Sequence, residues 1–316
     1  MDRLNSMMLD QTLNAGIFDF SDYSAFSTLS RIIIEAGFPN FNYKNKNRFG
    51  LMNSYKLAYE FFSFIDPLYA SYFEERFNSG DVCAKYFKKN SPTDQIALSY
   101  LGRDGTKKIY FPYGRNILDC FSLVHEILHD MNLDAHNLTV TRSMFTEYIS
   151  IYGEYLLYEY VRNTYGVDFS ADLKYTYRDG YKKAIIVDFQ LALIKEFLEK
   201  SNINYYDVAR IINSYDPYFR GILLEIFYNN LDKGELNIWY EIRYVIAVLL
   251  LSYTRDLEKT KKFDIDMFKF LNENINYLYP NEVYSMLDLD VSDEYTLSLS
   301  QDSYQKLRKS YSKYMR

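Results

Sequence analysis

Cysteine, histidine and long apolar runs are scarce in this chain of 316 residues. Its two cysteines, Cys83 and Cys120, are too few for a disulfide framework and lack the paired spacing of a thiolate metal site. The most apolar run, Tyr244 to Tyr253, is too short to span a bilayer, and the N-terminal stretch lacks the apolar core of a signal peptide. We therefore expect no membrane span, and a cytoplasmic protein or one exported without a cleavable signal peptide.

A basic surface is also missing. The net charge is -6 at pH 7, and no stripe of lysine and arginine occurs along the chain. Nucleic-acid binding draws much of its affinity from such stripes, so nucleic acid is not an expected partner. What is present is ample apolar material, 48% of the residues, which predicts a soluble globular protein with a sizeable core.

Helical periodicity runs through most of the sequence and predicts a mainly α fold. Apolar residues recur at three- and four-residue spacing in Ser24–Phe38 and Asn53–Pro67, and the second segment begins a helical hairpin with Pro67 at its corner. Further helices are expected at about 117–131, 142–165, 181–200, 206–214, 217–231 and 239–255.

The sequence pattern changes from helical to β-rich between Asp94 and Asn116. Two β-rich runs flank a Gly-Arg-Asp-Gly turn there, which predicts a β-hairpin whose second run ends directly before the helix at 117–131. This change predicts an N-terminal helical lobe at 1–90 and a catalytic domain at 91–316, with one continuous domain as the alternative.

The helix after the hairpin contains the stretch FSLVHEILHDMN, which holds two of the three histidines. His125 and His129 are four residues apart, so they share one helix face and can direct ring nitrogens at one point. Glu126 lies beside that point, as in zincins, where two imidazoles hold Zn²⁺ and the glutamate takes a proton from the zinc-bound water. The alternative is a pair of hydrogen-bonded core histidines.

A catalytic zinc needs a third protein ligand. The metzincin spacing would place a histidine where Ala135 stands and a glycine where Asn132 stands, which disfavours His136. Glu147 follows His129 by 18 residues on the next predicted helix. This arrangement matches the glutamate zincins, in which a second helix packs antiparallel to the first and presents a carboxylate to the metal.

A polar face marks that second helix, because Glu147, Ser150 and Glu154 lie at positions i, i+3 and i+7. Histidine ligands usually donate their other ring N–H to an acceptor, so Ser150 and Glu154 are candidates for residues that hydrogen-bond to the metal ligands. The alternative is a solvated stripe.

At this point the sequence resembles the oligopeptidases of the thimet oligopeptidase and oligoendopeptidase F type. The order KIYFPYGRN then FSLVHEILH is similar to the family's strand and HExxH helix, and MFTEYISIYGE is similar to its third-ligand segment. The resemblance implies a zincin-like, two-lobed helical architecture, with one zinc held by His125, His129 and Glu147 and with Glu126 as general base.

The same resemblance extends weakly to Trp239–Leu250, where Tyr240 and Tyr244 match tyrosines whose hydroxyls stabilise the tetrahedral intermediate. Ordinary packing is the alternative for these two residues, since the chain has 34 tyrosines. Departures from the family include Leu128 in place of its glycine and a chain about half the usual length.

These observations predict a zinc metalloendopeptidase that hydrolyses oligopeptides or one specific protein by Glu126-assisted attack of zinc-bound water. The hairpin's second run is expected to hold extended substrate by backbone pairing. Two alternatives stay open: a non-catalytic helical binding protein that keeps a remnant zinc site, and a helical scaffold without metal. The roles of Asp130 and His136 are also open.

Overall fold

The computed structural model describes residues 3–13, 20–39, 49–86, 97–102, 104–133, 144–259, 265–292 and 297–315. The chain divides into two compact units. The helical unit comprises Met1–Pro39, Tyr177–Tyr253 and Pro280–Arg316, and the mixed unit comprises Asn40–Thr176 and Thr254–Tyr279. The predicted boundary near residue 90 lies among residues 87–96, outside the described part of the chain.

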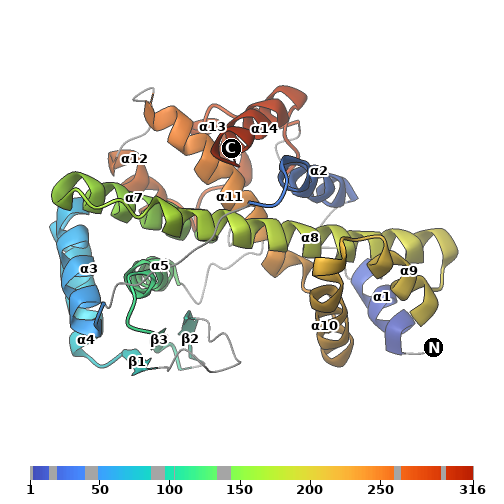
Figure 1. Cartoon of the computed structure of the whole chain (residues 1–316), viewed down its shortest axis with the longest axis horizontal. Coiled ribbons are helices and arrows are strands. Elements are labelled where there is room, and N and C mark those ends of the chain that lie inside the picture. Colours follow the sequence, from blue (N-terminus) through green and yellow to red (C-terminus); the bar gives the residue numbers. More distant parts are fainter. Residues whose placement is uncertain are drawn as a thin grey trace. The chain divides into compact units, whose positions relative to one another are not determined.

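The predicted mainly α fold with a small sheet is confirmed in the described residues (Figure 1). The helical unit contains α1 (Arg3–Leu13), α2 (Phe20–Ala36), α9 (Tyr205–Asn213), α10 (Pro217–Lys233), α13 (Pro280–Met286) and α14 (Gln301–Met315). The mixed unit contains α3 (Leu51–Ile65), α4 (Pro67–Asn78), β1 (Val82–Tyr86), β2 (Leu98–Leu101), β3 (Lys107–Tyr113), α5 (Leu118–Asn132), α7 (Thr146–Tyr165) and α12 (Ile265–Asn274). Both units contribute residues to α8 (Ser170–Lys200) and α11 (Ile238–Lys259).

The helices from α9 to α11 begin and end within a few residues of their predicted limits, whereas α8 begins well before its expected start at residue 181. The polar run Arg178, Asp179 and Gly180 interrupts the apolar pattern in the sequence but lies inside the helix. Gly180 packs against Val248 of α11, so closely that a β-carbon would lie 2.9 Å from a Val248 methyl group. This contact favours glycine there despite its low helix propensity.

The predicted corner at Pro67 separates α3 from α4. Asp66 caps α4, since its Oδ1 accepts a 2.9 Å hydrogen bond from the Leu68 backbone N–H, and Pro67 occupies the first helical position, where no N–H is needed. The fully buried Phe62 of α3 and Phe73 of α4 pack against each other between the two helices, with ring centres 5.5 Å apart. The helical hairpin of α3 and α4 thus forms one wall of the mixed unit.

The sheet has the strand order β1-β3-β2. β2 and β3 pair antiparallel, from Leu101 opposite Lys107 to Leu98 opposite Tyr110, which confirms the predicted hairpin. β1 pairs parallel with the other edge of β3, at Ile109 to Tyr113. The predicted substrate pairing is therefore wrong at Ile109 and Tyr110, which are paired on both sides. For Phe111 to Tyr113 it stays a prediction, because β2 ends opposite Tyr110.

Helix α5 lies at the centre of the mixed unit. Figure 1 shows it nearly end-on, with the three strands on one side and α7 on the other. Its apolar residues Leu123, Val124, Ile127 and Leu128 are completely buried. Burial of this kind is the main source of helix stability in proteins, so the segment that contains both histidines is held by the core on several sides.

The core of the helical unit includes the middle of α11, where Val245 to Leu251 are all buried. This is the most apolar run of the sequence, and here it packs as a core helix. Among the described residues, no helix combines the length and apolar character that a bilayer crossing requires.

Candidate metal centre

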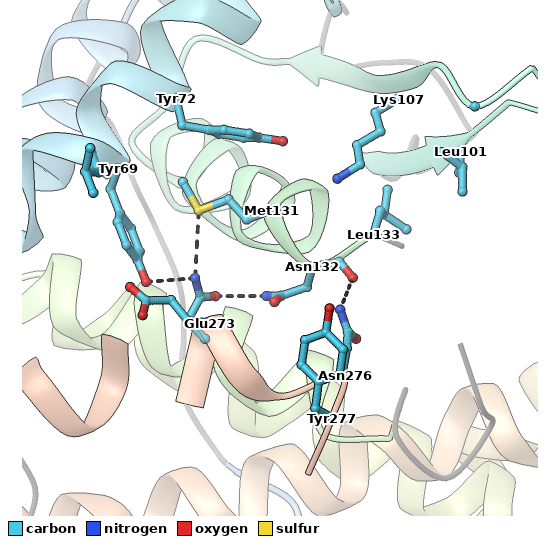
Figure 2. Close-up of a pocket in the computed structure, with 13 residues that line it drawn as sticks. Tyr69, Tyr72, Leu101, Lys107, Met131, Asn132, Leu133, Glu273, Asn276 and Tyr277 are labelled. Carbon is cyan, nitrogen blue, oxygen red and sulfur yellow. Dashed lines mark hydrogen bonds between the residues drawn. The ribbon is translucent and has the colours of Figure 1, made fainter. Parts of the chain in front are cut away.

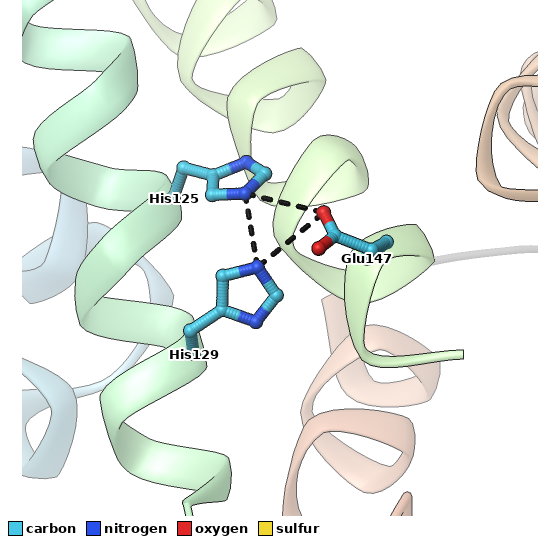
Figure 3. A group of neighbouring side chains, drawn as sticks. All are labelled: His125, His129 and Glu147. Carbon is cyan, nitrogen blue, oxygen red and sulfur yellow. Dashed lines mark hydrogen bonds and ion pairs between the residues drawn. The ribbon is translucent and has the colours of Figure 1, made fainter. Parts of the chain in front are cut away.

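The two histidines of α5 converge as their spacing predicts. His125 Nε2 and His129 Nε2 lie 3.0 Å apart, with the rings nearly perpendicular at 73°. Both side chains are mostly buried, with 12% and 17% of their surface exposed. The α-helix places side chains four residues apart on one face, and that face of α5 is directed at α7 (Figure 3).

Glu147, in the first turn of α7, completes a triangle with these histidines. Its Oε2 lies 3.4 Å from His125 Nε2 and 3.4 Å from His129 Nε2 (Figure 3). In the described residues these three side chains form a group able to hold a metal ion, with all of their ligand atoms within 4.8 Å of one another. The carboxylate is almost fully buried, at 3% exposure.

The triangle has the dimensions of a tetrahedral zinc site. Zinc binds nitrogen and oxygen at about 2.0–2.2 Å, and tetrahedral geometry then separates neighbouring ligand atoms by about 3.3–3.5 Å. The two nitrogen-to-oxygen distances fall in that range, and the nitrogen-to-nitrogen distance is slightly shorter. Two imidazoles and one carboxylate also supply three of the four ligands of a tetrahedral site, the number that catalytic zinc sites take from the protein. The residues therefore fit a metal of this kind.

Glu154 holds the first histidine from the opposite side. His125 Nδ1 donates to Glu154 Oε1 at 2.6 Å, so its Nε2 is the atom directed at Glu147. Glu154 contacts His125, whereas Glu147 reaches His129 one turn farther along α5, so the two helices run antiparallel. Such an outer carboxylate fixes the tautomer and orientation of a ligating histidine. Ser150, one turn after Glu147, is fully buried, and its hydroxyl makes no hydrogen bond with the described residues.

Charge and burial act in opposite directions on these groups. Burial by itself lowers the pKa of His125, but its hydrogen bonds with Glu147 and Glu154, and their negative charges, raise that pKa well above its usual range. Burial by itself raises the pKa of Glu147, but the positive charge of His129 and the hydrogen bonds from both histidines hold it well below its usual range. The cluster thus favours an ionised Glu147, the form that binds metal.

Close approach of α5 and α7 makes this geometry possible. Gly153 of α7 lies against Leu128 of α5, and a β-carbon on Gly153 would lie only 2.1 Å from Leu128 Cδ1. The large side chain of Leu128 is thus accommodated by a glycine on the facing helix. The two helices consequently pack closely enough for Glu147 to reach both histidines.

Glu126, the predicted general base, lies on the side of α5 that faces the sheet. Its carboxylate Oε2 accepts a 2.9 Å hydrogen bond from the Ser99 hydroxyl, and the same hydroxyl lies 2.6 Å from its backbone oxygen. Glu126 is buried, at 7% exposure. The sheet therefore orients this carboxylate through β2.

Asp130 anchors α5 to its neighbours. Its carboxylate is completely buried and accepts hydrogen bonds from Arg76 Nε at 2.7 Å and from the Tyr72 hydroxyl at 2.7 Å. Lys107 of β3 donates to its backbone oxygen at 2.9 Å, and Arg76 also pairs with Asp81 at 2.7 Å. The residue whose role the sequence left open is thus the centre of a network that ties α4 and the sheet to α5.

The C-terminal end of α5 borders a cavity of about 640 Å³. Figure 2 shows Tyr72 and Lys107 on one side of it and the turn that follows α12 on the other. Asn132 donates to Asn272 Oδ1 at 2.9 Å, and Asn276 donates to the backbone oxygen of Asn132 at 2.6 Å. The bond from Asn276 satisfies a backbone oxygen at the C-terminal end of α5, and both bonds attach α12 and the turn after it to α5.

The predicted tyrosines belong to the other unit. Tyr240 and Tyr244 lie on α11 in the helical unit, with their hydroxyls 3.4 Å apart. The amino group of Lys183 lies 5.2 Å and 5.0 Å from the two ring centres, and it pairs with the buried Glu241 at 2.8 Å. The geometry here is that of a cation–π cluster, and a catalytic role for these tyrosines stays a prediction. His136 lies outside the described residues.

The sequence did not predict the roles of Ser99, Tyr72, Arg76 and Gly153. A basic residue is favourable in the last turn of a helix, so the position of Arg76 in α4 has a local explanation. That local preference does not identify Asp130 as its partner. These four residues act through contacts between elements that are distant in the chain.

The chain matches no protein-family model, no curated protein and no solved structure in the comparisons made with them.

Proposed function

We propose that this chain is a zinc-dependent metallopeptidase that hydrolyses peptide bonds in oligopeptides or in one specific protein. The observation that carries the proposal is the ligand triangle of His125, His129 and Glu147, with Glu126 directly after His125 in the sequence of the same helix. A structural zinc site would need no additional carboxylate of this kind, and its fourth position would be closed by protein.

The donor set favours zinc among the common metals. Two imidazoles and one carboxylate suit zinc in a tetrahedral site, and the buried surroundings exclude the many waters that magnesium retains. When bound, zinc supplies a Lewis acid that polarises the substrate carbonyl and lowers the pKa of a water molecule. The identity of the metal and the zincin-like, two-lobed architecture are both parts of this proposal.

The side chains have distinct roles in the proposed reaction. Glu126 takes the proton of the attacking water and later delivers it to the leaving amine. Glu154 keeps the Nδ1 proton of His125 in place, so that Nε2 presents its lone pair to the metal. β2 is an edge strand in the described sheet and lies beside α5, so an extended peptide can add to it by backbone pairing.

A diverse peptide pool tests the proposed activity. The zinc-loaded protein is incubated with the pool beside Glu126→Gln, and the products are identified by mass spectrometry. We expect chelator-sensitive cleavage by the wild type and a loss of about 100-fold or more in the variant. Zinc content is measured on the same samples.

Two other outcomes would favour the alternatives. One zinc per chain with no turnover, unchanged by Glu126→Gln, favours a binding protein that keeps a remnant site. A His125→Ala variant with the same zinc content as wild type favours a scaffold without metal, since a metal bound only by the folded state must also stabilise it by mass action.

A further inference from the structure

A hydrogen bond from the sheet holds the carboxylate of Glu126. The Ser99 hydroxyl has one hydrogen and two acceptors within reach, the Glu126 backbone oxygen at 2.6 Å and its Oε2 at 2.9 Å. The single hydrogen is shared between them or alternates. One serine therefore ties both the main chain and the side chain of Glu126 to β2.

The position of Ser99 in the strand aims its side chain at α5. Successive side chains of a strand point to opposite faces, and both neighbours of Ser99, Leu98 and Tyr100, are exposed at 45% and 43%. Ser99 pairs with Ile109 of β3, which is completely buried. Residues opposite each other share a face, so Ser99 lies on the face that packs against α5.

We propose that Ser99 is a positioning residue that holds the Glu126 carboxylate in its reactive orientation and couples it to the edge strand β2. The inference rests on the proposed peptidase function. It adds that the strand available to an extended substrate also orients the general base. A substrate backbone that pairs with β2 would fix the strand, and through Ser99 it would fix Glu126.

Orientation matters here because proton transfer requires a hydrogen-bond distance between base and water in the transition state. A carboxylate without a partner samples several rotamers, and only some of them place an oxygen next to the attacking water. Hydrogen bonds to charged groups are stronger than those between neutral groups, so this one restricts the carboxylate effectively.

Threonine and valine have the same shape, so substituting each of them for Ser99 isolates the effect of the hydroxyl group. Ser99→Thr retains the hydroxyl, whereas Ser99→Val replaces it with a methyl group, so any strain caused by the larger side chain is common to both. We expect kcat of Ser99→Thr to stay close to that of wild type, and kcat of Ser99→Val to fall about 10- to 100-fold with KM little changed. Zinc affinity, measured by competition with a chromogenic chelator, should be the same in all three proteins.

The proposal is overturned if the two variants have equal kcat, or if the loss in Ser99→Val appears in KM alone. Equal losses would show that shape matters and the hydroxyl does not. A loss of zinc affinity in Ser99→Val alone would show a structural role in place of a positioning one.

A binding measurement separates this inference from the peptidase proposal. A peptide hydroxamate that ligates zinc has an acidic hydroxyl whose proton needs a neighbouring carboxylate, so its affinity reports on Glu126 without turnover. We expect about tenfold weaker binding to zinc-loaded Ser99→Val than to Ser99→Thr, with Glu126→Gln as the control that also weakens it. If wild type cleaves no peptide, the peptidase proposal fails; if Ser99→Val and Ser99→Thr bind the hydroxamate equally, the role of Ser99 fails.

Discussion

Leu128 of α5 and Gly153 of α7 form a matched pair at a close contact between the two helices that carry the candidate ligands. A β-carbon on Gly153 would lie 2.1 Å from Leu128 Cδ1, a distance that no real contact has. A methyl group there requires either a new rotamer for Leu128 or a wider spacing between the helices. The second change would move Glu147 away from His125 and His129.

Gly153→Ala should therefore destabilise the protein by about 1–3 kcal/mol, as overpacked cores do, and lower its zinc affinity. Denaturant unfolding and chelator competition measure the two effects. Gly221→Ala is the matched control: Gly221 also lies inside a helix but has open space around it, so the change should be neutral or stabilising by up to about 1 kcal/mol. The double variant that combines Gly153→Ala with Leu128→Ala should recover zinc affinity. If it does not, the contact between these two residues does not set the spacing of α5 and α7.

Glu147 and Glu154 should differ sharply in their effect on metal binding. Glu147→Ala removes a proposed ligand, while Glu154→Ala removes only the acceptor of the His125 Nδ1 proton. Loss of such an outer partner typically lowers metal affinity about 10- to 100-fold, and we expect a larger loss for Glu147→Ala. Zinc titration against a chelator of known affinity measures both, with Glu159→Ala on the same helix as control. Equal losses would mean that the wrong carboxylate has been assigned as the ligand.

Zinc binding should release at least one proton per chain near neutral pH. Hydrogen bonds and negative charge raise the pKa of His125 well above its usual range, so before zinc binds its ring is protonated, while Glu147 is already ionised. Lowering the pH therefore favours the proton over zinc and weakens zinc binding. Calorimetric titrations in two buffers of different ionisation enthalpy count the protons. Identical heats in the two buffers would contradict the prediction.

Asp130→Asn should destabilise the protein by about 3 kcal/mol, because the change leaves the mostly buried Arg76 with only one of its two acidic partners. The control is Asp302→Asn, whose pair with Lys306 is solvent-exposed and should contribute less than about 1 kcal/mol. Urea unfolding of both variants gives the comparison. A similar small effect for both would show that the network around Asp130 does not anchor α5.

Tyr240→Phe and Tyr244→Phe test the predicted oxyanion donors. Phenylalanine keeps the ring that lies beside Lys183 and removes only the hydroxyl, so stability should change little. If either hydroxyl stabilises the tetrahedral intermediate, its loss should lower kcat about 100- to 1000-fold. Unchanged kcat in both variants would assign the pair to packing in the helical unit.

The candidate metal ligands were predictable where the interactions are local. His125, Glu126 and His129 lie on one helix, and helical periodicity alone determines that the two rings converge. The i, i+3, i+7 spacing of the polar face likewise placed Glu147 and Glu154 on the side of α7 that meets α5. The β2–β3 hairpin was predictable for the same reason, since a short turn between two β-rich runs specifies it.

Contacts between distant segments could not be predicted in this way. The parallel strand β1 has one buried residue and no alternating pattern, so only its pairing with β3 makes it a strand. Ser99 and Arg76 look like ordinary surface residues in the sequence. Their partners, Glu126 and Asp130, are 27 and 54 positions away.

The sequence by itself thus determined the mainly helical fold, the hairpin and the group of candidate ligands, because these depend on periodicity and on spacing along one helix. The tertiary structure decided which strand stands at the edge of the sheet, which hydroxyl holds Glu126 and how closely α5 and α7 approach. These features depend on side-chain volumes and hydrogen bonds between elements, and such contacts form only when the chain brings distant residues together.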